Sequence, residues 1–151
     1  MLLFLDWSKA FDKVSPAALY YALHRFGVPA DFVQMITGVY DQRSFCVRAG
    51  GNTSRTHPQQ SGISQGCPLS PFLFVILMTV LLQDVEDNFA DSHGRTPDVD
   101  FLPVRDLLYV DDTLGAEVDQ HALQAFLDAV AEHGKKYGLS PNWDKSVFMA
   151  V

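Results

Sequence analysis

The sequence predicts an α+β domain in which helices pack on one face of an antiparallel sheet. Short apolar runs that end in acidic residues indicate strands, and Gly50-Gly51-Asn52 is a strong hairpin signal. Longer stretches with an apolar stripe at helical spacing indicate helices between these strands. A chain of 151 residues with 48% hydrophobic content fits one globular domain, residues 1–151.

The first part of the chain is expected to contain one strand and two helices. The apolar run over residues 2–5 ends at an acid and predicts a buried strand. A helix is expected between Ser15, a good N-cap, and Gly27, a good terminator. Its expected inward side chains are Leu19, Leu23 and Phe26. A second helix is expected over residues 29–40, with inward side chains Phe32, Ile36 and Val39.

The rest of the chain is expected to run as hairpin, helix, hairpin, helix and edge strand. Residues 70–80 are apolar almost all round, so the first half of the long helix should be buried. The expected elements are strand 45–47, turn 50–52, return strand 55–59, helix 70–89, loop 91–103, strand 107–110, return strand 113–116, helix 119–137 and strand 147–151. The expected inward side chains of the last helix are Leu123, Phe126, Leu127 and Val130.

Charge and cysteine content limit the possible functions. The net charge of −7 is the wrong sign for a protein that binds nucleic acid by itself, so such a function needs bound cations or basic parts supplied elsewhere. Cys46 and Cys67 show neither metal-ligand spacing nor a disulfide framework, which favours a nuclear or cytoplasmic location. The longest apolar run, residues 72–82, is too short to span a bilayer, and no membrane partner is expected.

Three acids stand at expected strand ends, Asp6 after the first strand and Asp111 and Asp112 in the second hairpin. If the strand ends are neighbours, these carboxylates require a cation, because like charges and desolvation raise the cost of ionisation. Oxygen ligands without His or Cys favour Mg²⁺ or Mn²⁺, and such a site fits two-metal phosphoryl transfer. Taken alone, each acid fits a solvated turn better, since Asp is common in turns.

Four motifs in the chain favour the metal site over the solvated turn. They are Asp-Trp-Ser-Lys-Ala-Phe-Asp at 6–12, Gln-Gly-Cys-Pro-Leu-Ser-Pro at 65–71, Tyr-Val-Asp-Asp at 109–112, and Gly-Leu with Asn142 and Lys145-Ser146 at 138–146. In this order they resemble palm motifs A to D of reverse transcriptases of the non-LTR retrotransposon (LINE-like) type. The resemblance implies a polymerase palm, a ferredoxin-like antiparallel sheet with helices on one face, with fingers and thumb largely missing.

The resemblance also implies roles for single residues. Asp6, Asp111 and Asp112 would hold two Mg²⁺ or Mn²⁺ ions, with the backbone carbonyl of Trp7 as a further ligand, and Lys145 would protonate the leaving pyrophosphate. The residues implied to line the incoming nucleotide are Trp7, Ser8, Lys9, Ala10, Phe11, Gln65 and Gly66. Phe11 would be the steric gate that selects dNTP over NTP. The alternatives are a core aromatic at position 11 and a solvated charge at position 145.

The implied function is RNA-directed DNA synthesis, the transfer of a nucleotide from dNTP to the 3′-hydroxyl of a DNA primer on an RNA template. The chain departs from the family at Ser64, where relatives often carry a basic residue. Fingers and thumb would have to come from a longer protein, so the isolated chain is expected to be weak or inactive. The alternative is a non-catalytic relic of a retrotransposon that acts at most as a binding module. A third reading, another palm-fold enzyme such as a nucleotide cyclase, does not account for the Gln-Gly-Cys-Pro motif.

Overall fold

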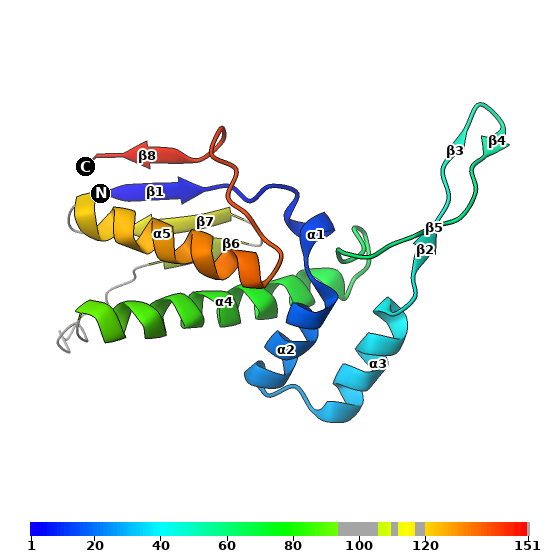
Figure 1. Cartoon of the computed structure of the whole chain (residues 1–151), viewed down its shortest axis with the longest axis horizontal. Helices are drawn as coiled ribbons and strands as arrows, with labels where there is room; N and C mark the ends of the chain where they lie inside the picture. The colour runs from blue at the N-terminus through cyan, green and yellow to red at the C-terminus, as the bar shows by residue number, and fades with distance from the viewer. Residues whose placement is uncertain (94–105, 110–111, 117–119, 151) are drawn as a thin grey trace.

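A four-stranded antiparallel sheet with helices on one side forms the body, and a thin arm projects from the end opposite the two termini (Figure 1). The computed structural model describes the backbone of residues 1–93, 106–109, 112–116 and 120–150. The elements are β1 (Leu2–Leu5), α1 (Ala10–Lys13), α2 (Pro16–Phe26), α3 (Ala30–Tyr40), β2 (Ser44–Phe45), β3 (Arg48–Ala49), β4 (Asn52–Thr53), β5 (His57–Pro58), α4 (Ser70–His93), β6 (Asp106–Tyr109), β7 (Asp112–Ala116), α5 (Gln120–Lys136) and β8 (Val147–Met149). The mixed helix-and-sheet composition confirms the predicted α+β class.

The sheet has the order β6-β7-β1-β8, so β8 is the edge strand that the sequence predicts. Both partners of β1 are antiparallel, with Leu5 opposite Thr113 in β7 and Phe4 opposite Val147 in β8. Leu5 is buried, whereas Phe4 is 43% exposed. The prediction of a strand buried on both faces is therefore wrong for Phe4, because the helices cover one face of the sheet and leave the other open.

Helix α5 lies against the covered face of the sheet, and its apolar stripe is largely as predicted. Leu123, Phe126 and Val130 are buried, and Leu127 is half-buried. The ring of Phe126 fits against β7 because position 115 is glycine: a β-carbon there would lie 2.9 Å from Cε1 of Phe126. One missing side chain thus sets how closely this helix approaches the sheet.

Helix α2 has the predicted ends and packs against α4. The hydroxyl of Ser15 accepts a hydrogen bond from the amide of Ala18, and Gly27 closes the helix with a φ of 91°. Leu19 and Leu23 are buried as predicted. Phe26 is 54% exposed, which corrects its predicted inward position. It lies in the last turn, where no described element covers it.

Helix α3 buries Ile36 as predicted, but the rest of its inward stripe differs from the predicted one. Its buried residues are Val33, Ile36 and Tyr40, whereas Phe32 and Val39 are both more than half exposed. Both stripes have helical spacing, and the packing of α3 against α2 selects between them. The pattern alone could not make this choice.

Helix α4 is longer than predicted and only partly enclosed in its first half. It continues to His93, and Phe72 near its start is 68% exposed. Of the expected loop over 91–103, the first three residues are helical, and 94–103 lie outside the described residues. The short helix α1 had no predicted counterpart. None of the helices in the described part of the chain is both long and apolar enough to cross a membrane.

The arm is a ribbon made of two short strand pairs. Ser44–Phe45 pair with His57–Pro58 at its base, and Arg48–Ala49 pair with Asn52–Thr53 at its tip. Gly50 and Gly51 form the turn, with φ values of 57° and 80°, whereas Asn52, which was predicted to be in the turn, begins β4. The expected continuous strands over 45–47 and 55–59 are wrong, since Cys46, Val47 and residues 54–56 lie outside the strands.

Candidate active site and its neighbours

Strand pairing brings two of the three predicted acids to the same end of the sheet. Asp6 directly follows Leu5, Asp112 directly precedes Thr113, and Leu5 and Thr113 are paired across β1 and β7. Asp6 is half-buried and Asp112 is exposed. Asp111 lies outside the described residues, among which no three His, Cys, Asp or Glu side chains form a group that could hold a metal.

The segment after α5 holds Asp6 in place. The side-chain amide of Asn142 donates a hydrogen bond to Asp6 Oδ2 at 2.9 Å, and its backbone amide donates to the carbonyl oxygen of Asp6 at 2.8 Å. The amide of Asp6 donates to Oγ of Ser146 at 3.3 Å. Sequence reasoning gave Asn142 no role, although the motif that contains it was the available signal.

Trp7 connects the same strand end to β7 through its side chain. The indole is 3% exposed, and its Nε1 donates to Thr113 Oγ1 at 3.0 Å. Gly134 of α5 makes room for the ring, because a β-carbon there would lie 3.0 Å from Trp7 Cζ3. The side chain of Trp7 is therefore part of the fold, and its predicted site role rests on the backbone carbonyl.

The segment that carries Gln65 and Gly66 is fastened to α1. The amides of Gly62 and Ile63 donate to the carbonyl oxygens of Val14 and Phe11 at 2.8 and 2.7 Å. Gly62 has a φ of +88°, and a β-carbon there would lie 2.7 Å from the carbonyl oxygen of Asp12, so the close approach requires glycine. These contacts bring the first and second motifs together.

A cavity of about 540 Å³ lies between α1 and the start of α4. Its lining residues are Phe11, Gln65, Gly66, Cys67, Pro68, Ser70 and Pro71. The ring of Phe11 stacks on Phe74 with a centroid distance of 4.7 Å, and Gln65 Nε2 donates to Asp12 Oδ1 at 3.2 Å. Three of the residues predicted to contact the nucleotide thus line one cavity.

Cys67 at the wall of this cavity is half-buried. A hydrogen bond from the backbone of Leu69 lowers the pKa of its thiol.

The remaining predicted residues lie around this site in different environments. The amide of Ser8 donates to the carbonyl oxygen of Ser140 at 2.9 Å, so the fold already uses this backbone donor. Lys9 is exposed and has a left-handed backbone with φ 53°. Ala10 is buried, and Lys145 is exposed in the turn after Asn142.

Arg43 is bound to the segment that carries Ser64. Its Nη1 donates to Ser64 Oγ at 2.8 Å, and its Nη2 donates to the carbonyl oxygen of Gly62. The guanidinium also lies over the ring of Tyr40, 4.3 Å from the centroid. Arg43 therefore brings a positive charge to the position of Ser64.

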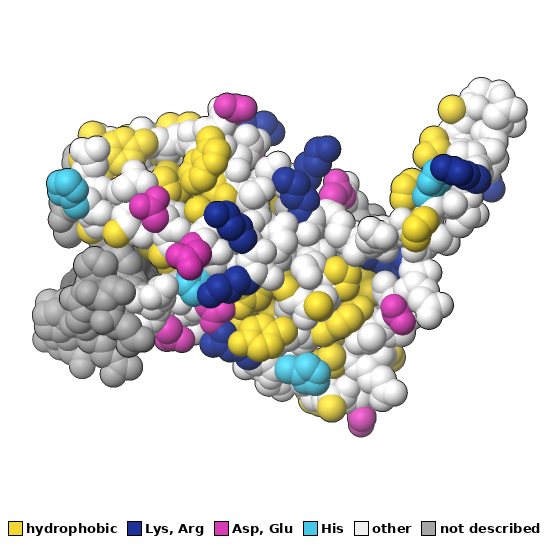
Figure 2. Space-filling view, in the orientation of Figure 1, with side chains coloured by type: hydrophobic (Ala, Val, Ile, Leu, Met, Phe, Trp, Pro, Cys, Tyr) yellow, Lys and Arg dark blue, Asp and Glu magenta, His cyan; other side chains and the backbone are white. Residues whose placement is uncertain are grey.

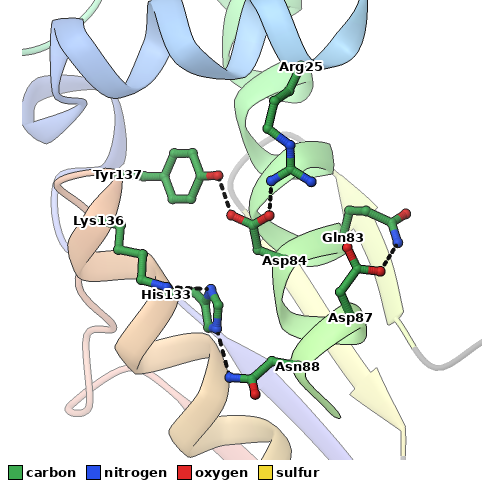
Figure 3. Close-up of polar contacts among 8 residues, drawn as sticks. All are labelled: Arg25, Gln83, Asp84, Asp87, Asn88, His133, Lys136 and Tyr137. Atoms are coloured by element: carbon green, nitrogen blue, oxygen red, sulfur yellow. Dashed lines mark hydrogen bonds and ion pairs between the residues drawn. The ribbon is translucent and has the colours of Figure 1, made fainter. Parts of the chain in front are cut away.

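A second cavity, of about 690 Å³, lies where α2, α4 and α5 meet (Figure 3). Arg25 and Tyr137 both donate to the carboxylate of Asp84, and Asn88 and Lys136 contact the buried ring of His133. Burial and the carboxylate of Asp84 raise the pKa of Tyr137. Although burial opposes it, hydrogen bonding from Tyr137 and Arg25 lowers the pKa of Asp84. Neither Asp6 nor Asp112 lines this cavity, whose polar contacts hold the three helices together.

Comparison with known proteins identifies the family. Residues 1–151 match the family described as reverse transcriptase (RNA-dependent DNA polymerase). The chain belongs to the reverse transcriptase family. This reverse transcriptase chain is 34% identical over 97% of its length to the Retrovirus-related Pol polyprotein from type-1 retrotransposable element R2 of Popillia japonica. It is 28% identical, over 94% of its length, to the RNA-directed DNA polymerase from mobile element jockey of Drosophila melanogaster.

These relatives confirm the non-LTR, LINE-like type, but they are far longer. The chain covers 20% of the R2 polyprotein and 15% of the jockey polymerase. Among solved structures, it superimposes on telomerase from Candida albicans with a TM-score of 0.74 over 99% of its residues and 27% of that chain. At 16% identity this likeness concerns the fold alone.

The bond between Trp7 and Thr113 is expected to stabilise the site measurably. Trp7→Phe and Thr113→Val each leave a buried polar group without its partner, which is expected to cost about 1–3 kcal/mol of unfolding free energy. In a double-mutant cycle measured by urea unfolding, the coupling is expected to be about 1 kcal/mol. Trp143→Phe, at a residue that is 58% exposed, is the matched control and should change little. A coupling free energy near zero would show that the hydrogen bond between Trp7 and Thr113 does not contribute to stability.

Proposed function

We propose that this chain is the palm of a reverse transcriptase and that its site transfers a nucleotide from dNTP to the 3′-hydroxyl of a DNA primer on an RNA template. The observation that carries the proposal is the pairing of Leu5 with Thr113, which puts Asp6 and Asp112 at one end of the sheet. The cavity beside α1 supports it, because Phe11, which follows Asp6 by five positions in the chain, lines a space for a small molecule together with Gln65 and Gly66.

The donor set at this end of the sheet fits two divalent ions of the Mg²⁺ or Mn²⁺ type. Asn142 donates a hydrogen bond to Oδ2 of Asp6, whereas Oδ1 of Asp6 accepts none from the described residues. Asp6, Asp111 and Asp112, with the carbonyl of Trp7, would supply the hard oxygen ligands that these ions prefer. When bound, such ions activate the attacking oxygen and stabilise the leaving one. Asn142 would act as a positioning residue for Asp6.

The cavity residues would position the incoming nucleotide. Phe11 presents a flat ring at the cavity wall and is backed by Phe74, so a 2′-hydroxyl against the ring would meet a side chain that cannot retreat. The amide of Gln65 can both donate and accept hydrogen bonds. Ser8, Lys9 and Ala10 would form the wall between the acids and this cavity, and Lys145 would approach the pyrophosphate.

We further propose that the isolated chain transfers nucleotides slowly. Positioning contributes much of phosphoryl-transfer catalysis, and the chain spans a fifth of the R2 polyprotein, so parts that grip primer and template would come from a longer protein. The rival proposal, a non-catalytic relic, has the same fold and the same acids but predicts that these acids do not bind metal ions. Metal binding separates the two.

Removal of one acid is expected to weaken binding of Mn²⁺, the ion used as probe. In isothermal titration, Asp111→Ala and Asp6→Ala should each weaken binding by at least about tenfold, and Asn142→Ala by about 10–100-fold, since it frees Asp6 to turn away. Asp128→Ala, at an exposed acid of α5, is the matched control and should bind like the wild type. Equally weak binding by wild type and Asp111→Ala would remove the metal site and favour the relic.

Phe11→Ala is expected to reduce discrimination between dATP and ATP. With Mn²⁺ present, calorimetry should show tighter binding of dATP by the wild type and a narrower ratio for the variant, because the smaller side chain leaves room for the 2′-hydroxyl. Phe32→Ala removes an equally large, exposed ring far from the cavity lining and serves as the control. An unchanged ratio in Phe11→Ala would make Phe11 a core aromatic only.

A further inference from the structure

The arm differs in charge from the rest of the chain. All 18 acidic side chains lie outside residues 42–83, a segment that contains Arg43, Arg48, Arg55 and His57. Figure 2 shows Lys or Arg side chains beside a histidine on the visible face of the arm, and no acidic side chain there. A protein of net charge −7 therefore projects a basic ribbon from one end.

The two outer arginines of the arm have no acidic partner among the residues that the structure describes. Arg48 and Arg55 are both exposed. The one ion pair in the described parts of the chain joins Arg25 to Asp84 and so involves neither of them. Arg43, at the base of the arm, is instead bound to Ser64 and Gly62. Of the three arginines, Arg43 thus joins the base of the arm to the body, and Arg48 and Arg55 are presented to solvent.

Aromatic and apolar side chains accompany these arginines. The rings of Phe45 and His57 stack with centroids 5.6 Å apart, and Phe45 is 49% exposed. Val47, between Phe45 and Arg48, is also more than half exposed. An exposed ring close to arginines on a narrow ribbon suits a single-stranded nucleic acid, whose phosphates contact the guanidinium groups while a base stacks on the ring.

We propose that the arm, residues 44–58, binds single-stranded RNA, with Arg48 and Arg55 on phosphates and Phe45 under a base. This inference rests on the proposed function, which supplies the RNA as template. The base of the arm is joined through Arg43 to the segment that leads to Gln65, so a strand along the arm is directed toward the cavity beside Phe11.

Salt dependence of RNA binding tests the proposal with the whole chain. The probe is a fluorescently labelled oligouridylate, and its anisotropy gives the affinity between about 50 and 200 mM salt. Loss of two phosphate contacts in Arg48→Gln/Arg55→Gln is expected to reduce the slope of log affinity against log salt by about 1.4. Over that range the wild type should then lose about sevenfold more affinity than the variant. Phe45→Ala should weaken binding by about tenfold.

Matched controls remove the same charge or ring elsewhere. Lys135→Gln/Lys136→Gln, at the exposed end of α5, should keep the wild-type slope, and Phe32→Ala should keep the wild-type affinity. Circular dichroism checks that each variant is folded. No binding by the wild type, or the same slope in the arm variant as in the wild type, would overturn the proposal.

Asp6→Asn separates this inference from the proposed function. It should retain RNA binding by the arm while losing Mn²⁺. If RNA binding depends on the arm but the wild type binds no Mn²⁺, the polymerase proposal fails and the arm proposal stands. If Mn²⁺ binds at the acids while the arm variant binds RNA normally, the arm proposal alone fails.

Discussion

The position of β1 between β7 and β8 is the constraint on which the site depends. Leu5 is paired with Thr113 on one side, and Phe4 with Val147 on the other. A slip of one residue would turn Leu3 and Leu5 to solvent and Phe4 into the core, so burial fixes the register. This register also fixes the positions of the residues that follow β1. Trp7 can therefore donate a hydrogen bond to Thr113, and Asp6 can accept one from Asn142.

The features that local chemistry controls could be predicted from the sequence. Ser15 and Gly27 end a helix through their own backbone preferences, and Gly50-Gly51 form a turn because both residues have positive φ. The acidic motifs followed apolar runs, which indicated strand ends before any pairing was known. The proximity of Asp6 and Asp112 required the additional assumption that the two strands are neighbours.

The features that distant contacts control could not be predicted. Phe32 and Val39 share helical spacing with the buried stripe of α3, and only the packing of α3 against α2 decides which stripe turns inward. The hydrogen bonds of Asn142 and Trp7 join residues more than one hundred positions apart, and no local pattern encodes them. The need for glycine at position 62 could not be predicted either, because the close approach of Gly62 to Asp12 depends on how the second motif packs on α1.

The body and the arm of the molecule differ in charge. Asp6 and Asp112 lie at one end of the sheet, where they would need a cation, whereas the arm contains arginines and no carboxylate. Arg43 links the two regions by donating a hydrogen bond to Ser64, so the base of the arm places a positive charge beside that residue. An acidic protein can in this way present a basic surface where a polynucleotide would enter.

The most direct test of the account is the register between β1 and β7 in solution. Nuclear Overhauser contacts between backbone protons report which residues of antiparallel strands lie opposite each other. Contacts that link Leu5 with Thr113, and Asp6 with Asp112, would agree with the account. Contacts that shift this pairing by a residue or more, or a β1 that pairs elsewhere, would separate the acids and contradict it.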